Sequence, residues 1–217
     1  MIEEVIFDLD GTLLNTVASI AKCCNDTLAE FGYVPFAEER YKYFAGDGAR
    51  NLVKRALIAS GDTELTHFEE AFARYDERFK EGCMYKVTIY EGIPELIAEL
   101  KRRSIKLAVL SNKQHDRTVS MIRHFFGEDT FDVILGQMDG VPIKPDPKAV
   151  DLIMDKTSVT LREALLYVGD TATDMKTGHN AGLRTVGVLW GFRTREELES
   201  NGADHIIEKP EGLLKIV

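Results

Sequence analysis

The sequence predicts an α/β protein with a doubly wound parallel sheet, interrupted near its start by a helical insert. Short apolar runs recur along the chain with helical patterns between them, and one long interval carries helical patterns alone. Nearly continuous apolar runs are typical of strands that are buried on both faces of a parallel sheet. Alternating strands and helices favour right-handed crossovers and a Rossmann-like strand order of 3-2-1-4-5-6.

Six apolar runs carry the strand pattern, and five helical patterns lie between them. The expected strands are Glu4–Asp8, Lys106–Leu110, Asp132–Leu135, Leu165–Gly169, Thr185–Leu189 and Asp204–Ile207. The expected helices are Pro94–Arg103, Asp116–Phe126, Pro147–Lys156, Thr173–Ala181 and Arg195–Ser200. This alternation predicts one α/β core domain, formed by residues 1–14 and 87–217.

The interval 15–86 breaks the alternation, and we expect a separate helical cap domain there. Its helical patterns are Asn15–Gly32, Ala37–Phe44, Gly48–Ser60 and Glu64–Glu81. Its expected core is Ile20, Leu28, Phe31, Phe44, Leu52, Leu57, Phe68, Phe72 and Phe79. Because both connections of this insert flank the polar cluster described below, a mobile lid is favoured over a decoration that only adds stability.

Composition limits the classes of protein to consider. The formal net charge of −9 and the pI of about 5.1 argue against a nucleic-acid binder, which usually shows a basic surplus. The acidic start lacks a signal-peptide pattern, and no stretch is apolar enough to span a membrane. The odd count of cysteines, Cys23, Cys24 and Cys83, argues against a disulfide framework. We expect a cytoplasmic protein with reduced thiols.

The sharpest chemical signal is Asp8-Leu9-Asp10-Gly11-Thr12, directly after the first expected strand. An extended backbone would point Asp8 and Asp10 to the same side, and Gly11 lets the chain turn sharply. Two carboxylates this close repel unless a metal or a shared proton relieves them. Asp8 can then serve as an ionised nucleophile and Asp10 as a general acid. A plain turn is the alternative, because Asp and Gly both favour turns.

Three later clusters follow other expected strands. Ser111-Asn112 offers a hydroxyl and an amide that can donate to phosphoryl oxygens, although Ser111 could instead cap the next helix. Lys144, beside two prolines, can neutralise charge on a transferring phosphoryl group, although most lysines lie on the surface. Asp170 and Asp174 can ligate or support Mg²⁺, although capping of the next helix by Asp170 or Thr171 is the alternative.

The expected sheet order brings these clusters together. The first, second and fourth strands are neighbours in that order, so Asp8, Ser111 and Asp170 converge on one crevice. Each alternative is reasonable singly, but together they require four polar clusters to reach strand ends of one sheet by accident. We therefore expect a magnesium-dependent site that acts on a phosphoryl group.

The motifs, in this order and strand context, resemble those of the haloacid dehalogenase superfamily over nearly the whole chain. The resemblance implies that Asp8 is the nucleophile and that Asp10 protonates the leaving oxygen and later activates water. It implies that Ser111 and Lys144 orient the phosphoryl group and that the insert is the cap. The implied metal ligands are Asp8, Asp10 through its backbone carbonyl, and Asp170. Asp174, one helical turn after Asp170, is the fourth expected metal-site residue and can support the metal or its waters.

Single residues favour one branch of this superfamily. Dehalogenases and phosphonatases lack the second aspartate, so Asp10 favours a phosphatase. The tripeptides Ser111–Lys113 and Trp190–Phe192 are similar to those of phosphoglycolate phosphatases, whereas Asn15 departs from the aspartate that relatives often carry. The loop at residues 46–48 resembles their cap loop. The expected substrate contacts are Thr12, Asn112, Gly46, Asp47, Gly48 and Arg50.

These observations predict a phosphatase that hydrolyses a small phosphate monoester, phosphoglycolate-like, through a phospho-aspartate on Asp8 with Mg²⁺ as cofactor. A sugar-phosphate mutase similar to β-phosphoglucomutase, or a pyrophosphatase or nucleotidase of the same superfamily, is the alternative enzyme. A receiver-like phosphoprotein module is the alternative from another class, but its acceptor aspartate lies well inside the chain. The expected partner is a small phosphorylated metabolite, without nucleic acid or membrane, for a monomer or homodimer.

Overall fold

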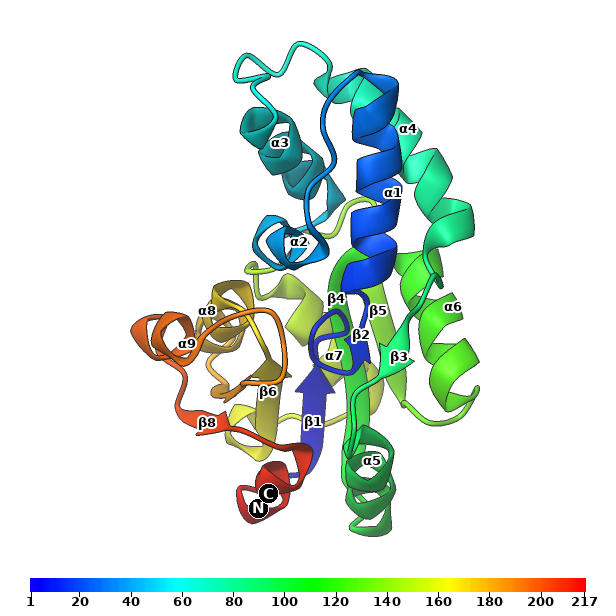
Figure 1. Cartoon of the computed structure of the whole chain (residues 1–217). Coiled ribbons are helices and arrows are strands. Elements are labelled where there is room, and N and C mark those ends of the chain that lie inside the picture. The colour runs from blue at the N-terminus through cyan, green and yellow to red at the C-terminus, as the bar shows by residue number, and fades with distance from the viewer. The chain divides into compact units, whose positions relative to one another are not determined.

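A computed structural model describes all 217 residues and divides them into two compact units. The core unit comprises Met1–Leu14 and Ile89–Val217, and the helical unit comprises Asn15–Thr88. The chain passes between them twice, at the short paired strands β2 (Leu14–Asn15) and β3 (Thr88–Ile89) (Figure 1). Each unit is described below by itself.

A six-stranded parallel sheet forms the centre of the core unit. Its strands are β1 (Glu4–Phe7), β4 (Lys106–Gln114), β5 (Val133–Gln137), β6 (Leu165–Gly169), β7 (Arg184–Val188) and β8 (His205–Ile207). They lie in the order β5-β4-β1-β6-β7-β8, with every neighbouring pair parallel. Counted along the chain, this is the order 3-2-1-4-5-6, so the predicted fold class is confirmed.

Helices cover both faces of this sheet, as the strands' burial requires. Adjacent side chains of β1, such as Ile6 and Phe7, point to opposite faces, and both are essentially inaccessible to solvent. One face packs against α7 and the segment around Ala181 and Leu183. The core helices are α5 (Ile93–Arg102), α6 (His115–Phe126), α7 (Lys148–Thr157), α8 (Ala172–Asn180) and α9 (Arg195–Ser200), with 3₁₀ turns at Arg162–Ala164 and Pro210–Lys215.

The main departure from the predicted strands is the length of β4. The apolar run ends at Leu110, but the strand continues through Ser111 and Asn112 to Gln114. Its pairing with β5 shifts register between Leu110 and Gln114, which marks a bulge or irregularity. The apolar pattern ends early because the residues beyond Leu110 are polar: Asn112 binds the Lys144 backbone, and Lys113 pairs with Asp10. Ser111 therefore lies within the strand, and the alternative that it caps the next helix is wrong.

The helical unit contains four helices, as the 15–86 interval suggested: α1 (Val17–Glu30), α2 (Glu38–Phe44), α3 (Ala49–Ala59) and α4 (Phe68–Gly82). Most of its expected core is buried, but Phe31 and Phe72 are only half-buried. Tyr41 and Tyr75 are buried in addition, and Tyr41 reaches a partner by donating to Asn25 Oδ1. A tyrosine can enter a core when its hydroxyl has such a partner.

Two further expectations concern reduced cysteine thiols and the lack of a stretch apolar enough to span a membrane. Cys23, Cys24 and Cys83 are buried and form no disulfide. Burial raises the pKa of the Cys24 thiol to about 12, which suits an inert packing role. None of the helices combines the length and the apolar character that a membrane span requires.

Glu4 is a buried carboxylic acid in β1, on the opposite end of the strand from Asp8. Its Oε2 accepts a hydrogen bond from Thr157 Oγ1 at 2.9 Å, whereas Oε1 is buried without a partner. Burial raises the pKa of Glu4 to about 7, against the opposing effects of Thr157 and Lys106, and Asp132 raises it further. The folded protein therefore favours the protonated acid.

We expect this acid to make the protein less stable as the pH rises from about 4.5 to about 7. In that window the unfolded chain has released the proton that the folded state retains, so the free energy of unfolding falls by roughly 3 kcal/mol. Glu4→Gln should flatten that part of the profile. Urea unfolding at pH 5 and pH 8 measures the effect, and an equal pH dependence in both proteins would show that Glu4 is ionised when folded.

Candidate active site

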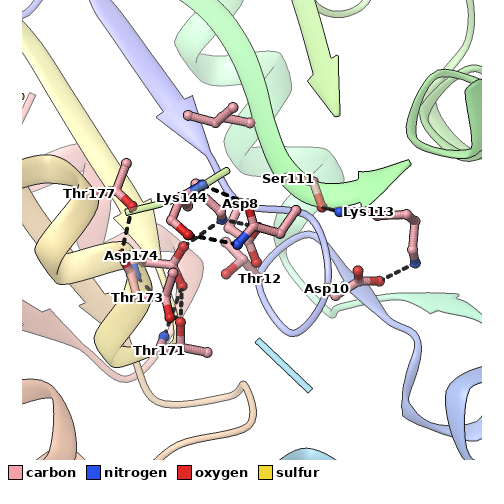
Figure 2. A network of polar contacts seen from close by, with 12 residues as sticks. Asp8, Asp10, Thr12, Ser111, Lys113, Lys144, Thr171, Thr173, Asp174 and Thr177 are labelled. Atoms are coloured by element: carbon pink, nitrogen blue, oxygen red, sulfur yellow. Dashed lines mark hydrogen bonds and ion pairs between the residues drawn. The ribbon is translucent and has the colours of Figure 1, made fainter. Parts of the chain in front are cut away.

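Three carboxylates and one lysine meet at the carboxyl ends of β1 and β6. Lys144 Nζ lies 2.6 Å from Asp8 Oδ1 and 2.8 Å from Asp174 Oδ1 (Figure 2). Asp170 follows β6 directly and lies beside the same group. The carboxyl ends of neighbouring parallel strands meet at one sheet edge, which is why Asp8 and Asp170, 162 positions apart in sequence, become neighbours here.

The turn after β1 fixes Asp8. The backbone N–H of Asp8 donates to the Val168 carbonyl at 2.9 Å, which continues the pairing with β6. Gly11 then adopts a φ of +89°, in the region that favours glycine. A Cβ on Gly11 would lie 2.2 Å from Asp170 Oδ2, so a side chain here would displace a carboxylate of the site. The predicted sharp turn at Gly11 is therefore confirmed, and it also makes room for Asp170.

Asp170 is fully buried and held by two donors. Thr12 Oγ1 donates to Oδ1 at 3.1 Å, and the Phe192 N–H donates to Oδ2 at 2.7 Å. Gly191 allows this approach, because a Cβ there would lie 2.3 Å from Asp170 Cβ. Burial, followed by the charges of Asp174 and Asp8, raises the pKa of Asp170 well above its usual range.

Asp174, in the first turn of α8, binds both Lys144 and Thr171. Its Oδ2 accepts hydrogen bonds from the Thr171 N–H at 3.0 Å and from Thr171 Oγ1 at 2.7 Å, while Oδ1 accepts from Lys144. Thr171 and Asp174 also form a capping box at the start of α8. Helix capping was the alternative to a metal role at this position, and the structure shows that capping and contact with the site occur together.

Lys144 is a buried cation whose backbone is fixed by Asn112. The Asn112 amide accepts from the Lys144 N–H at 2.8 Å and donates to its carbonyl at 3.1 Å. Burial alone would lower the pKa of Lys144, but the neighbouring Asp174 and Asp8 outweigh it and raise the pKa well above the usual range. The side chain, only 2% exposed, is therefore charged, and the surface alternative for this lysine is wrong.

Asp8, Asp170 and Asp174, called the acid group below, have the composition of a divalent-cation site. Ligand oxygens of Asp8, Asp170 and Asp174 all lie within 4.8 Å of one another, and all three residues are buried. When all three carboxylates are ionised, they exceed the single positive charge of Lys144 by two negative charges. Without a cation, burial and the neighbouring acids raise the pKa of Asp8 to about 7, although Lys144 opposes the change. Hard carboxylate oxygens suit Mg²⁺, so the residues fit such an ion.

Comparison with known proteins decides the family. Residues 5–188 match the family model described as haloacid dehalogenase-like hydrolase. The chain belongs to the haloacid dehalogenase-like hydrolase family. Its sequence is 33% identical over 195 residues to phosphoglycolate phosphatase from Rhodobacter capsulatus, which covers 89% of this chain and 87% of that protein.

One relative of this haloacid dehalogenase-like hydrolase is named for a different substrate. N-acetylmuramic acid 6-phosphate phosphatase from Pseudomonas putida is 30% identical over 218 residues, covering all of this chain and 96% of that protein. The crystal structure of a candidate phosphoglycolate phosphatase from Lactobacillus delbrueckii subsp. bulgaricus superposes with a TM-score of 0.89 at 29% identity. The match covers 99% of this chain and 97% of that one. Phosphatase is thus the activity that the named relatives share.

Asp10 does not join the three buried acids of this hydrolase. Its carboxylate pairs with Lys113, whose Nζ lies 2.6 Å from Asp10 Oδ1. The sequence led us to expect a metal or a shared proton to relieve the repulsion between Asp8 and Asp10. In the structure each carboxylate has its own lysine, Lys144 for Asp8 and Lys113 for Asp10, and the metal expected beside them stays a prediction.

Thr12 and Asn112 lie at the site, but their side chains contact the protein. Thr12 is buried against Asp170, and its carbonyl accepts from Trp190 Nε1 at 2.9 Å. Asn112 binds the backbone of Lys144. The structure thus gives both a positioning role, and their predicted contact with substrate stays a prediction. Ser111 is 4% exposed, and its Oγ accepts from the Lys113 N–H at 3.2 Å.

Asp47 and Arg50, two of the predicted substrate contacts in the helical unit, form ion pairs within that unit. Arg55 makes two hydrogen bonds of 2.6 Å to the carboxylate of Asp47, in the loop where Gly46 and Gly48 have φ values of +120° and +94°. Arg50 pairs with Glu69 at 2.6 Å. Its guanidinium also lies 4.6 and 4.7 Å from the ring centroids of Phe68 and Phe72. Their contact with a substrate stays a prediction.

Sequence reasoning missed four contributors to this site. Lys113 was quoted for its resemblance but given no role, although its place two residues after Ser111 in a strand puts it near the same edge. Thr171 was read only as a possible cap. Trp190 and the Phe192 N–H come from the turn after β7, and nothing in the sequence spacing indicated that they contact Thr12 and Asp170, respectively.

Proposed function

We propose that this chain is a magnesium-dependent phosphatase that hydrolyses a small phosphate monoester through a phospho-aspartate on Asp8. The observation that carries the proposal is the buried group of Asp8, Asp170 and Asp174 around Lys144, in which three ionised carboxylates would exceed the charge of the lysine by two. A phosphoryl group needs a nucleophile, a fixed cation and charge neutralisation in one place, and these residues supply them. The family and its named phosphatases support the same reaction class.

In the proposed mechanism, Asp8 attacks phosphorus and forms an acyl phosphate. Ser111 and Lys144 donate hydrogen bonds to the phosphoryl oxygens, which fixes the phosphorus in line with the attacking carboxylate. Asp10 gives a proton to the departing alcohol oxygen. The same carboxylate then takes a proton from the water that cleaves the acyl phosphate, and Asp8 is regenerated. Asp174 holds Lys144 in place at 2.8 Å throughout.

We propose that Asp8, Asp170 and the backbone carbonyl of Asp10 would hold Mg²⁺, with Asp174 in an outer position. When bound, Mg²⁺ supplies positive charge that offsets the charge on the phosphoryl oxygens. Both oxygens of Asp174 already accept hydrogen bonds from Lys144 and Thr171, which supports its outer position.

We further propose that the helical unit, Asn15–Thr88, serves as a cap that encloses the substrate. The first crossing between the units follows closely on the first motif of the proposed site, since Asn15 comes seven positions after Asp8. A lid in this place would exclude water during formation of the acyl phosphate. The loop at Gly46–Gly48, rigidified by the Asp47–Arg55 pair, is the proposed substrate-facing part.

The substrate class proposed is a small phosphate monoester whose alcohol part carries a carboxylate, with phosphoglycolate as the reference. Phosphoglycolate and N-acetylmuramic acid 6-phosphate phosphatases are both relatives, and both names describe phosphate esters of a carboxylic acid. A panel of phosphometabolites, ranked by kcat/KM for phosphate release, tests this. The panel should include both esters, a sugar phosphate, a nucleotide and pyrophosphate. Conversion of a sugar phosphate into its isomer, with little phosphate released, would instead identify a mutase.

Removal of Mg²⁺ should stop turnover reversibly, because two negative charges of the acid group would lack a counter-charge. We also expect added Mg²⁺ to raise the melting temperature of the wild-type protein, since a ligand that binds only the folded state stabilises it. Asp170→Asn should lose that thermal shift together with activity, whereas Asp155→Asn, on the exposed side of α7, should retain both. Full activity in excess chelator would remove Mg²⁺ from the proposal.

A further inference from the structure

The site contains a second buried lysine, which the mechanism above does not use. Lys113 Nζ lies 2.6 Å from Asp10 Oδ1, and its side chain is 6% exposed. Figure 2 shows this pair apart from the Asp8–Lys144–Asp174 network, with the carboxylate of Asp10 directed toward Lys113. The structure thus holds two lysine–carboxylate pairs, one for each aspartate of the first motif.

Several contacts fix Lys113 from both ends. Its N–H donates to Ser111 Oγ at 3.2 Å, and its carbonyl accepts from Thr118 Oγ1 at 3.2 Å. Gly136 of β5 lies so close that a Cβ there would be 2.5 Å from the Lys113 carbonyl. At the other end, Nζ lies 3.6 Å from Met121 Sδ on α6. A long side chain held at backbone and tip loses little entropy when it binds a carboxylate.

We propose that Lys113 is a positioning residue that orients the Asp10 carboxylate for its two proton transfers. This inference rests on the proposed function, in which Asp10 is the general acid and base. A charge-assisted hydrogen bond of 2.6 Å is short and directional, so it fixes the rotation of the carboxylate. Lys113 binds Oδ1 and leaves Oδ2 as the oxygen that faces the leaving group and then the water.

The pair also separates Asp10 from the other acids. Asp8 and Asp10 leave the same strand two residues apart, and two free carboxylates there would repel and scatter over several rotamers. Lys113 draws the Asp10 carboxylate to the side of β4 and α6. A misplacement of about 1 Å in a catalytic group can cost on the order of 100-fold in rate, so this orientation has a kinetic value.

The test uses substrates that differ in their need for a general acid. An alkyl phosphate such as β-glycerophosphate releases a poor leaving group that must be protonated, whereas 4-nitrophenyl phosphate releases a stable phenolate. Under single-turnover conditions, Lys113→Met should slow release of the alkyl alcohol at least about tenfold. It should slow release of 4-nitrophenol less than about threefold, since that step needs little proton transfer.

Conservative variants separate positioning from a structural role. Lys113→Arg keeps the charge and the donor, so its ratio of alkyl to nitrophenyl rates should stay within about threefold of the wild-type ratio. Lys113→Gln keeps a hydrogen-bond donor without the charge, so its ratio of alkyl to nitrophenyl rates should lie between those of the wild type and Lys113→Met. If Lys113→Met does not fold, Lys113→Gln provides the test instead. Equal losses for both substrates in Met and Gln variants, or no loss for either, would overturn the inference.

Asp8→Asn distinguishes this inference from the proposed function. If that variant loses release of both alcohols while Lys113→Met keeps the wild-type ratio, only the role of Lys113 fails. If Asp8→Asn retains release of both alcohols, the proposed mechanism fails as a whole, and the inference fails with it.

Discussion

Asp8→Asn is expected to reduce phosphate release by roughly three orders of magnitude or more, because the amide cannot form the acyl phosphate. The fold should remain intact. Lys144 keeps its second partner, Asp174, at 2.8 Å, so no buried cation is left unpaired. Burial already raises the pKa of Asp8 to about 7 in the metal-free protein, so loss of its charge removes repulsion from Asp170 and Asp174.

Stability and activity should therefore change in different directions for this variant. At pH 8 without Mg²⁺, the melting temperature of Asp8→Asn should equal or exceed that of the wild type, because the ionised carboxylate is disfavoured in the folded state. Asp155→Asn, at an exposed position, should leave both quantities unchanged. Phosphate release by Asp8→Asn at more than a few per cent of the wild-type rate would point to another nucleophile.

Lys144→Met is expected to impair both activity and stability. Removing the only cation within the acid group leaves Asp8, Asp170 and Asp174 buried together, and breaking a buried ion pair on one side costs about 3–5 kcal/mol. Loss of one fixed donor to the phosphoryl group should lower kcat by roughly 100- to 1,000-fold. Phosphate-release kinetics and urea unfolding measure the two effects.

Magnesium should partly compensate for the missing lysine in stability but not in rate. The charge excess rises from two to three in Lys144→Met, so added Mg²⁺ should raise its melting temperature more than that of the wild type. Lys156→Met, with the same change of residue type at an exposed position of α7, is the matched control. A variant that melts like the wild type in the absence of Mg²⁺ would show that Lys144 does not neutralise the acid group.

The sheet and the convergence of the site were predictable because both follow from where apolar runs end. Asp8 and Asp170 come directly after buried strands, and the 3-2-1-4-5-6 order makes those strands neighbours. Backbone pairing then brings the two residues together without any knowledge of side-chain contacts. Lys144 was predictable for a different reason, since two prolines stiffen its segment and a lysine held in this way can neutralise charge on a transferring phosphoryl group.

The partners of individual side chains were less predictable. The pair of Lys113 and Asp10 depends on the continuation of β4 to Gln114 past the end of its apolar run, and on the irregular pairing with β5. The hydrogen bond from the Phe192 N–H to Asp170 depends on a backbone turn, and backbone donors leave no signature in residue type. In the helical unit, Tyr75 is buried while Phe72 is only half-buried, which reflects the rotation of α4 rather than hydrophobicity.

Chemical trapping addresses the role of Asp8 without any mutation. Enzyme mixed with a ³²P-labelled substrate and Mg²⁺ is quenched in acid within the first turnover, digested, and its labelled peptides identified by mass spectrometry. We predict a single hydroxylamine-sensitive label on the peptide that carries Asp8, at a level that falls as phosphate appears. Label on a different residue, or phosphate release with no labelled protein at any time, would contradict a phospho-aspartate at this position.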